Sequence, residues 1–132
     1  MKPTLKHTLA AIILVLSVTA PLAAGPFEDA NAAYRDGDYA TALRLYRPLA
    51  DQGNDDAQAA LGAMYELGYG VPQDYVQAHM WFNLVGARTS DDKKRDFAVK
   101  YRDAIAAKMT SVQIAEAQKL AREWKPTKQP SR

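Results

Sequence analysis

Residues 61–74 have the sequence LGAMYELGYGVPQD, and this stretch decides the fold. Leu61, Met64 and Tyr65 recur at the i, i+3 and i+4 spacing that places apolar side chains on one face of a helix. Gly68 lies where that helix should end, because glycine enters the left-handed conformation without a Cβ clash. The aspartate that closes the stretch precedes a second amphipathic run and can cap its first turn. The stretch therefore predicts two helices joined by a glycine-containing loop.

The pattern occurs twice in the chain. A shift of 36 residues aligns residues 38–46, D-Y-x-x-A-x-x-x-Y, with residues 74–82, D-Y-x-x-A-x-x-x-F, and a shift of 31 residues aligns Tyr34 with Tyr65. Repeated units of this length, each built from two helices, are typical of an α-solenoid. The alanine in each motif lets the two helices of a pair approach closely, and the aromatic residue one turn later fills the space against the next pair. Since a single pair cannot bury both of its faces, the units must stack.

Helical spacing extends over the rest of the chain, which has no alternating β-branched run that could form a sheet face. Phe97, Tyr101 and Ile105 form one apolar stripe of this kind. The sequence therefore predicts an all-α fold, and the short links predict that neighbouring helices pack as antiparallel hairpins. The six predicted helices are 27–36, 39–51, 56–67, 75–86, 90–107 and 111–124.

Two helix pairs are fewer than the roughly three that stacking favours, so a further pair should close the array. We expect the pair 90–124 to cover the apolar face of residues 75–86, with ion pairs Asp91–Arg95 and Asp96–Lys100 on its solvent side. The predicted repeat domain spans residues 25–124, with units at 27–54 and 55–88. The tail 125–132 has two prolines and no apolar anchor, which predicts disorder.

Residues 1–24 have the three parts of a secretory signal peptide. Lys2 and Lys6 form a positive end, an apolar run of eight residues follows at Leu9–Leu16, and small residues precede a predicted cleavage after Ala24. The run would rise only about 12 Å as a helix, short of the ~30 Å hydrocarbon core, which argues against the alternative of an uncleaved membrane anchor. The sequence therefore predicts an exported protein without stable membrane insertion, periplasmic or secreted.

Composition narrows the possible functions. Without the leader, the chain has as many basic as acidic residues, which argues against the broad positive field that nucleic acid or an anionic membrane requires. The absence of cysteine excludes disulfides, thiolate metal sites and a cysteine nucleophile. We expect no catalytic residue, no cofactor and no metal site.

Two residues could still have a role in metal binding or catalysis. His79 lies beside the apolar stripe of residues 75–82 without a second histidine or a cysteine, so we interpret it as a partly exposed surface histidine. The alternatives are a polar contact in a binding groove and a weak metal ligand. Ser90-Asp91-Asp92-Lys93 matches S-x-x-K, the acylating motif of penicillin-binding enzymes, but the partner motifs S-D-N and K-T-G are missing. We interpret Ser90 as the N-cap of the fifth helix.

The stretch 61–74, followed by Ala78 and Trp81, resembles the Sel-one-like repeat, a relative of the tetratricopeptide repeat. The resemblance covers about residues 27–88, and the first unit, with its short turn at 36–39, is closer to a plain tetratricopeptide unit. The second unit departs from the pattern at its end, residues 85–88. The residues that define the repeat are Tyr34, Ala42, Tyr46, Leu61, Gly62, Tyr65, Gly68, Gly70, Asp74, Ala78, Trp81 and Phe82.

The resemblance implies a short right-handed superhelix that binds a protein or peptide without catalysis, as an adaptor or regulatory scaffold in the bacterial cell envelope. In related repeats the first helix of each pair lines the binding groove. The implied groove residues are polar side chains of those helices and an aromatic side chain on a loop that has no helical face to join: Asn31, Arg35, Gln58, Glu66 and Tyr69.

Two alternatives stay open at this point. Some cysteine-rich relatives of this repeat bind or hydrolyse penicillins, although those are stapled by disulfides that this chain cannot form. The other alternative is a structural protein that self-associates by stacking incompletely capped repeats end to end.

Overall fold

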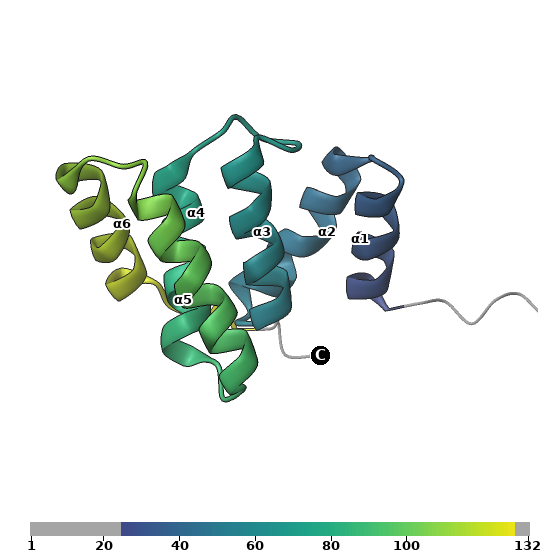
Figure 1. Ribbon diagram of the computed structural model, residues 1–132. Helices are drawn as coiled ribbons and strands as arrows, with labels where there is room; N and C mark the ends of the chain where they lie inside the picture. The colour runs from purple at the N-terminus through teal and green to yellow at the C-terminus, as the bar shows by residue number, and fades with distance from the viewer. Residues whose placement is uncertain (1–24, 129–132) are drawn as a thin grey trace, which may run out of the picture.

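The computed structural model describes residues 25–128, and this part of the chain contains helices joined by loops and no strand, as predicted (Figure 1). Every helix boundary lies within two residues of its predicted position. The leader 1–24 and residues 129–132 of the tail lie outside the described residues. The helices are α1 (Pro26–Arg35), α2 (Tyr39–Asp51), α3 (Asp55–Leu67), α4 (Tyr75–Arg88), α5 (Asp92–Ala106) and α6 (Ser111–Glu123).

Short polar side chains start most of these helices. The carboxylates of Asp38 and Asp74 accept hydrogen bonds from the backbone N–H three residues later, both at 3.1 Å, as predicted. Thr110 and Gln113 form a reciprocal capping box at the start of α6. These caps satisfy backbone donors that have no partner within the helix.

The start of α5 differs from the prediction, because Asp91 rather than Ser90 is the N-cap. Asp91 Oδ1 accepts hydrogen bonds from the backbone N–H groups of Lys93 and Lys94, at 2.9 and 3.1 Å. The hydroxyl of Thr89 in turn accepts the N–H of Asp91 at 3.2 Å, which holds the cap in place. With Asp91 committed to capping, the guanidinium of Arg95 pairs with Asp92 instead of the predicted Asp91.

Helices α1 to α5 pack in order, each against the next, and α6 packs against α4. The expected hairpin between α5 and α6 is therefore wrong, since both helices take α4 as their main neighbour. Figure 1 shows α5 and α6 on different sides of α4. The closing pair thus covers α4 from two directions.

Two apolar clusters meet at α4. The first joins α1, α2 and α3 to Met80, Trp81 and Leu84, and the end of α6 packs against it. The second joins Ala78, Phe82 and Val85 to buried residues of α5. Since α4 contributes to both clusters, it is buried on most of its circumference, which explains its continuous run of buried residues from 78 to 82.

Small residues set the distance between α3 and α4. Gly62 is buried, and a Cβ at this position would lie only 2.8 Å from Cε2 of Phe82, inside the van der Waals contact distance. Ala42 and Ala78 are fully buried, and the aromatic residues one turn later, Tyr46 and Phe82, are buried as well. The pairs therefore nest through small residues facing aromatic rings, as the repeat pattern indicates.

The described part of the tail has a place in the fold that its composition did not predict. Trp124 ends α6, packs against the first cluster, and lies 3.8 Å from where a Cβ on Gly53 would be. The backbone N–H of Thr127 donates to the carbonyl of Asp51, the last residue of α2, at 2.8 Å. Residues 124–127 thus connect the end of α6 to the turn between α2 and α3.

His79 is buried, with 3% of its surface exposed, so the interpretation as a partly exposed surface histidine is wrong. Its Nδ1 has no hydrogen-bond partner. Burial lowers the pKa of His79, and the positive charge of Arg102 acts in the same direction, against the opposing charge of Asp103. The side chain is therefore held in its neutral form by the packing of α4 against its neighbours.

None of the helices within residues 25–128 combines the length and the apolar character needed to cross a bilayer.

The contact between Gly62 and Phe82 leads to a first prediction. Gly62→Ala should lower the free energy of unfolding by about 1–3 kcal/mol, because the buried ring of Phe82 cannot move aside. The better helix propensity of alanine, worth ~1 kcal/mol, offsets only part of this loss. Thermal or urea unfolding followed by circular dichroism measures the change.

Gly86→Ala is the matched control, since the nearest atom to its Cβ would be a methyl carbon of Val99, at 3.2 Å, and the next atoms lie at 4.0 Å. This variant should stay within ~1 kcal/mol of wild type. Equal stability of Gly62→Ala and Gly86→Ala would show that the close approach of α3 and α4 is not needed.

Burial of neutral His79 leads to a second prediction. Because its pKa is lower in the folded than in the unfolded chain, the unfolded chain binds more protons, so stability should fall as the pH drops below the ordinary value of 6.5. The free energy of unfolding, measured by urea titration between about pH 7.5 and pH 5.5, should decrease with falling pH. His79→Gln should have a flatter pH profile over this range; an unchanged slope would contradict the assignment.

Candidate partner-binding groove

Two adjoining pockets lie along α3, on the side that α3 shares with α5. One, of about 260 Å³, has walls from α1, α2 and α5 and a floor from α3, and is lined by Tyr34, Tyr46, Ala59, Ala60, Ala63 and Phe97. The other, of about 230 Å³, lies at the beginning of α3 and is lined by Asp55, Asp56, Ala59, Val85, Lys93, Lys94 and Phe97. Because they share Ala59 and Phe97, we treat them as one surface and call it the α3 groove.

Alanines form the floor of the α3 groove. Ala59, Ala60 and Ala63 follow one another on the exposed side of α3 and are only partly buried. Since their side chains end at Cβ, the larger side chains around them extend further from the helix, and a recess remains above the alanines. The floor therefore exists because the residues of α3 at this surface are small, while the larger Leu61 and Met64 are fully buried.

Aromatic side chains form the walls. The ring of Tyr46 is fixed by a hydrogen bond from its hydroxyl to Oδ1 of Asn31, at 2.5 Å. On the opposite wall, the ring of Phe97 lies with its centroid 4.4 Å from that of Tyr101, and both rings lie against the buried ring of Phe82. These contacts hold the walls in defined positions.

Phe97 and Tyr101 are exposed, at 46% and 40%, which corrects the predicted core stripe on this helix. Only Ile105, the third member of that stripe, is fully buried. The i, i+4 spacing placed the three side chains on one face, but it could not show that the array ends before the first two are covered. Sequence reasoning therefore missed Phe97 as a groove residue.

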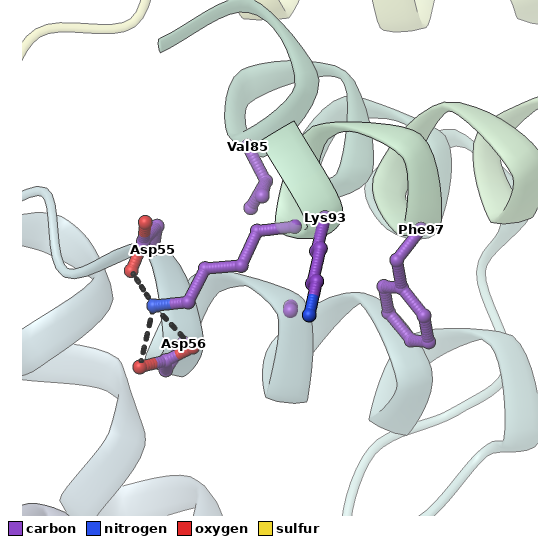
Figure 2. A pocket seen from close by; sticks show the side chains of 7 residues that line it. Asp55, Asp56, Val85, Lys93 and Phe97 are labelled. Atoms are coloured by element: carbon purple, nitrogen blue, oxygen red, sulfur yellow. Dashed lines mark hydrogen bonds and ion pairs between the residues drawn. The ribbon is translucent and has the colours of Figure 1, made fainter. Parts of the chain in front are cut away.

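An ion-pair cluster closes the end of the groove near the start of α3 (Figure 2). The ammonium of Lys94 lies 3.2 Å from Oδ1 of Asp55 and 2.9 Å from Oδ1 of Asp56, and the hydroxyl of Thr89 donates to Oδ2 of Asp55 at 2.8 Å. Burial alone would raise the pKa of Asp55, but the hydrogen bonds from Thr89 and Lys94 outweigh it and hold the pKa below its ordinary value. The hydrogen bonds that Lys94 donates to Asp56 and, next in effect, to Asp55 raise the pKa of Lys94.

These ion pairs tie α5 to α3. Lys93 lines the same pocket, and Figure 2 shows it between the ion pairs and the ring of Phe97. The groove thus combines an apolar floor with a charged end.

The five predicted groove residues line neither of these two pockets. Gln58 is wrong as a groove residue, because it is only 2% exposed and its Nε2 donates to the carbonyl of Ala50 at 3.0 Å, which joins α3 to α2. Asn31 supports the wall through Tyr46. Arg35 is exposed at the end of α1, and the half-buried Glu66 lies 4.0 Å from the ammonium of Lys108. For Arg35 and Glu66 the role in binding stays a prediction.

Tyr69 has neighbours that the sequence did not reveal. Its ring stacks on Tyr39 with centroids 4.4 Å apart, and Tyr34 lies 6.3 Å away. Gly70 makes this contact possible, since it has a φ of 72° and a Cβ would lie 2.8 Å from the backbone oxygen of Tyr39. The loop between α3 and α4 therefore packs on the first unit, and Tyr69 fixes one repeat to the next.

The residues that define the repeat have the structural positions that the pattern requires. Gly68 ends α3 in the left-handed conformation, and Asp74 caps α4. Tyr34 and Tyr65 are half-buried, and the hydroxyl of Tyr65 accepts a hydrogen bond from the guanidinium of Arg47. The buried members are Ala42, Tyr46, Leu61, Gly62, Ala78, Trp81 and Phe82.

Residues 25–128 contain no group of three or more histidine or acidic side chains placed to hold a metal ion. The side chains of the α3 groove offer shape, apolar surface and paired charges.

Comparison with known proteins agrees with this architecture. The family model of the Sel1 repeat matches residues 30–54 and 55–84. Among solved structures, a protective antigen of uropathogenic Escherichia coli strains that displays an SLR fold is similar, with a TM-score of 0.66 and 33% identity over 75% of this chain. The chain spans only 21% of that antigen. The search of curated proteins gave no match.

Repeats of this kind generally serve as protein-interaction modules and are typically non-catalytic scaffolds. Both matched segments fall on observed helix pairs, α1–α2 and α3–α4. The chain therefore contains two Sel1 repeats and belongs to the Sel1-like repeat proteins.

Proposed function

We propose that this protein is a non-catalytic module that binds a segment of a partner protein in the α3 groove. The observation that carries the proposal is the exposed ring of Phe97, which lines the groove beside a floor of alanines and packs against the exposed Tyr101. Large aromatic residues that stay exposed at the edge of a recess are typical of binding sites, because covering them with a partner releases a large apolar area.

The fixed position of these rings favours binding. Phe97 and Tyr101 support each other and lie on the buried Phe82, so they lose little conformational freedom when a partner covers them. The two pockets, of about 260 and 230 Å³, each have room for one or two side chains of a partner. An extended segment that lies along α3 could fill both.

The charged end of the groove gives the segment an orientation. Asp55 and Asp56 are already paired with Lys94, whereas no ion pair involves Lys93 among the described residues. A partner with an acidic group near this end would complete the charge pattern, and charge complementarity of this kind contributes more to specificity than to affinity.

The cell envelope is the proposed location, with a role as adaptor or regulatory scaffold. The support for it comes from the sequence: a positive end, an apolar run too short to span a bilayer, and small residues before a cleavage position at Ala24. The proposed compartment is the periplasm.

The proposal predicts that Phe97 dominates binding. Peptides selected from a displayed random library against the wild-type protein should bind Phe97→Ala at least about tenfold more weakly, because hot-spot aromatics contribute ~2 kcal/mol or more. Isothermal titration calorimetry measures the affinities, and circular dichroism should show the same fold for both proteins.

Val112→Ala, which removes a side chain that is 75% exposed on α6, away from the groove, is the control and should bind like wild type. Arg35→Ala and Glu66→Ala in the same assay test the two candidates that came from the sequence. Equal affinities of wild type and Phe97→Ala would rule out the α3 groove as the binding site. Light scattering that shows concentration-dependent assembly, abolished by Phe97→Ala, would identify self-association instead.

A further inference from the structure

A third pocket, of about 270 Å³, lies between the C-terminal halves of α4 and α6 and shares no residue with the α3 groove. We call it the α4–α6 pocket. Its lining is Asn83, Leu84, Ala87, Arg88, Ala121, Arg122 and Trp124.

The charges of this pocket all have one sign. Arg88 and Arg122 line it and no acidic residue does. Within residues 25–128, neither arginine takes part in an ion pair. Arg102 of α5 donates to Oδ1 of Asn83 at 3.2 Å and is itself paired with Asp103. Two unpaired guanidinium groups therefore share one small pocket, an arrangement that an anion would stabilise.

Arg88 is held in position for such a contact. The central carbon of its guanidinium lies 4.8 Å from the centroid of the Trp124 ring. A guanidinium over an aromatic ring keeps N–H donors that can still bind an oxygen ligand. A donor group fixed by stacking loses less conformational freedom on binding than a free side chain.

A structural role explains only part of this arrangement. A basic residue in the last turn stabilises a helix, and Arg88 and Arg122 lie in the last turns of α4 and α6. That effect accounts for one cation at each helix end, but it does not require the two to line the same pocket. It also does not explain the apolar surface beneath them, from the buried Leu84, the two alanines and Trp124.

We infer that the α4–α6 pocket binds a carboxylate that carries a short apolar body. The arginines bind the carboxylate oxygens, since the guanidinium edge matches a carboxylate with two parallel N–H···O bonds. The apolar surface of Leu84, Ala87 and Ala121 covers the body of the ligand. The pocket volume suits a small organic acid or the last residue of a peptide chain, and the two sources share this chemistry.

The test uses the full chain and two versions of one probe, one charged and one neutral. N-acetyl-phenylalanine carries the carboxylate, and N-acetyl-phenylalaninamide has the same apolar body without the charge. NMR titration should show the acid shifting the indole N–H of Trp124 and the side-chain N–H signals of Arg88 and Arg122. The amide should bind at least about tenfold more weakly, because it lacks the charged partner of the arginines.

Variants separate binding from folding. Arg122 is exposed, so Arg122→Gln should keep the wild-type melting temperature while its affinity for the acid falls about tenfold. Arg88→Gln should have the same effect on the acid and also alter the Trp124 signal. Arg44→Gln, at an exposed arginine of α2, is the control and should bind like wild type.

Three results would overturn the inference: equal binding of acid and amide, full affinity of Arg122→Gln for the acid, or no shift of these signals at about 10 mM acid. Comparison with 3-phenylpropionate distinguishes the two sources. Tighter binding of N-acetyl-phenylalanine points to a peptide C-terminus, and tighter binding of 3-phenylpropionate points to a free acid.

Discussion

The close approach of α3 and α4 is the constraint on which the rest of the structure depends. The ring of Phe82 occupies the space that a side chain at Gly62 would need, so the two helices can pack at this distance only because that position has no Cβ. The same ring also contacts Phe97 and Tyr101 of α5, with ring centroids 6.3 and 5.6 Å away. One buried aromatic residue thus connects the second repeat to the helix that closes the array, and α4 becomes the helix shared by both apolar clusters.

Both candidate binding surfaces follow from this arrangement. Because α5 covers one side of α4, its exposed Phe97 comes to lie beside the alanines of α3 and forms one wall of a groove. Because α6 covers another side of α4, the last turns of the two helices bring Arg88 and Arg122 to one pocket, with Trp124 between α6 and the first cluster. The array therefore has a mainly apolar recess on α3 and a basic one between α4 and α6. A protein of only two repeats thus has two candidate binding surfaces because its closing helices, α5 and α6, pack on different sides of α4.

The sequence predicted what depends on neighbours along the chain. The helices, the caps at Asp38, Asp74 and Thr110, and the small positions such as Gly62 follow from local spacing and backbone preference. The prediction from sequence was wrong where the burial of a residue depends on contacts with distant segments of the chain. Burial of Gln58 depends on the carbonyl of Ala50 in another helix, and burial of His79 depends on the helices that pack against α4. The predicted groove residues are mostly polar, whereas the structure forms the groove from alanines and aromatic rings, a combination that apolar periodicity cannot distinguish from core.

Native-state hydrogen exchange tests most directly whether α4 is the shared core of the molecule. The backbone amides of residues 78–85, in the middle of α4, should exchange only through global unfolding, together with the facing turns of α3. Helix α1, which packs mainly against α2, should open at a lower free energy. Amides of α4 that exchange through a local opening, at a lower free energy than those of α1 and α2, would contradict the account.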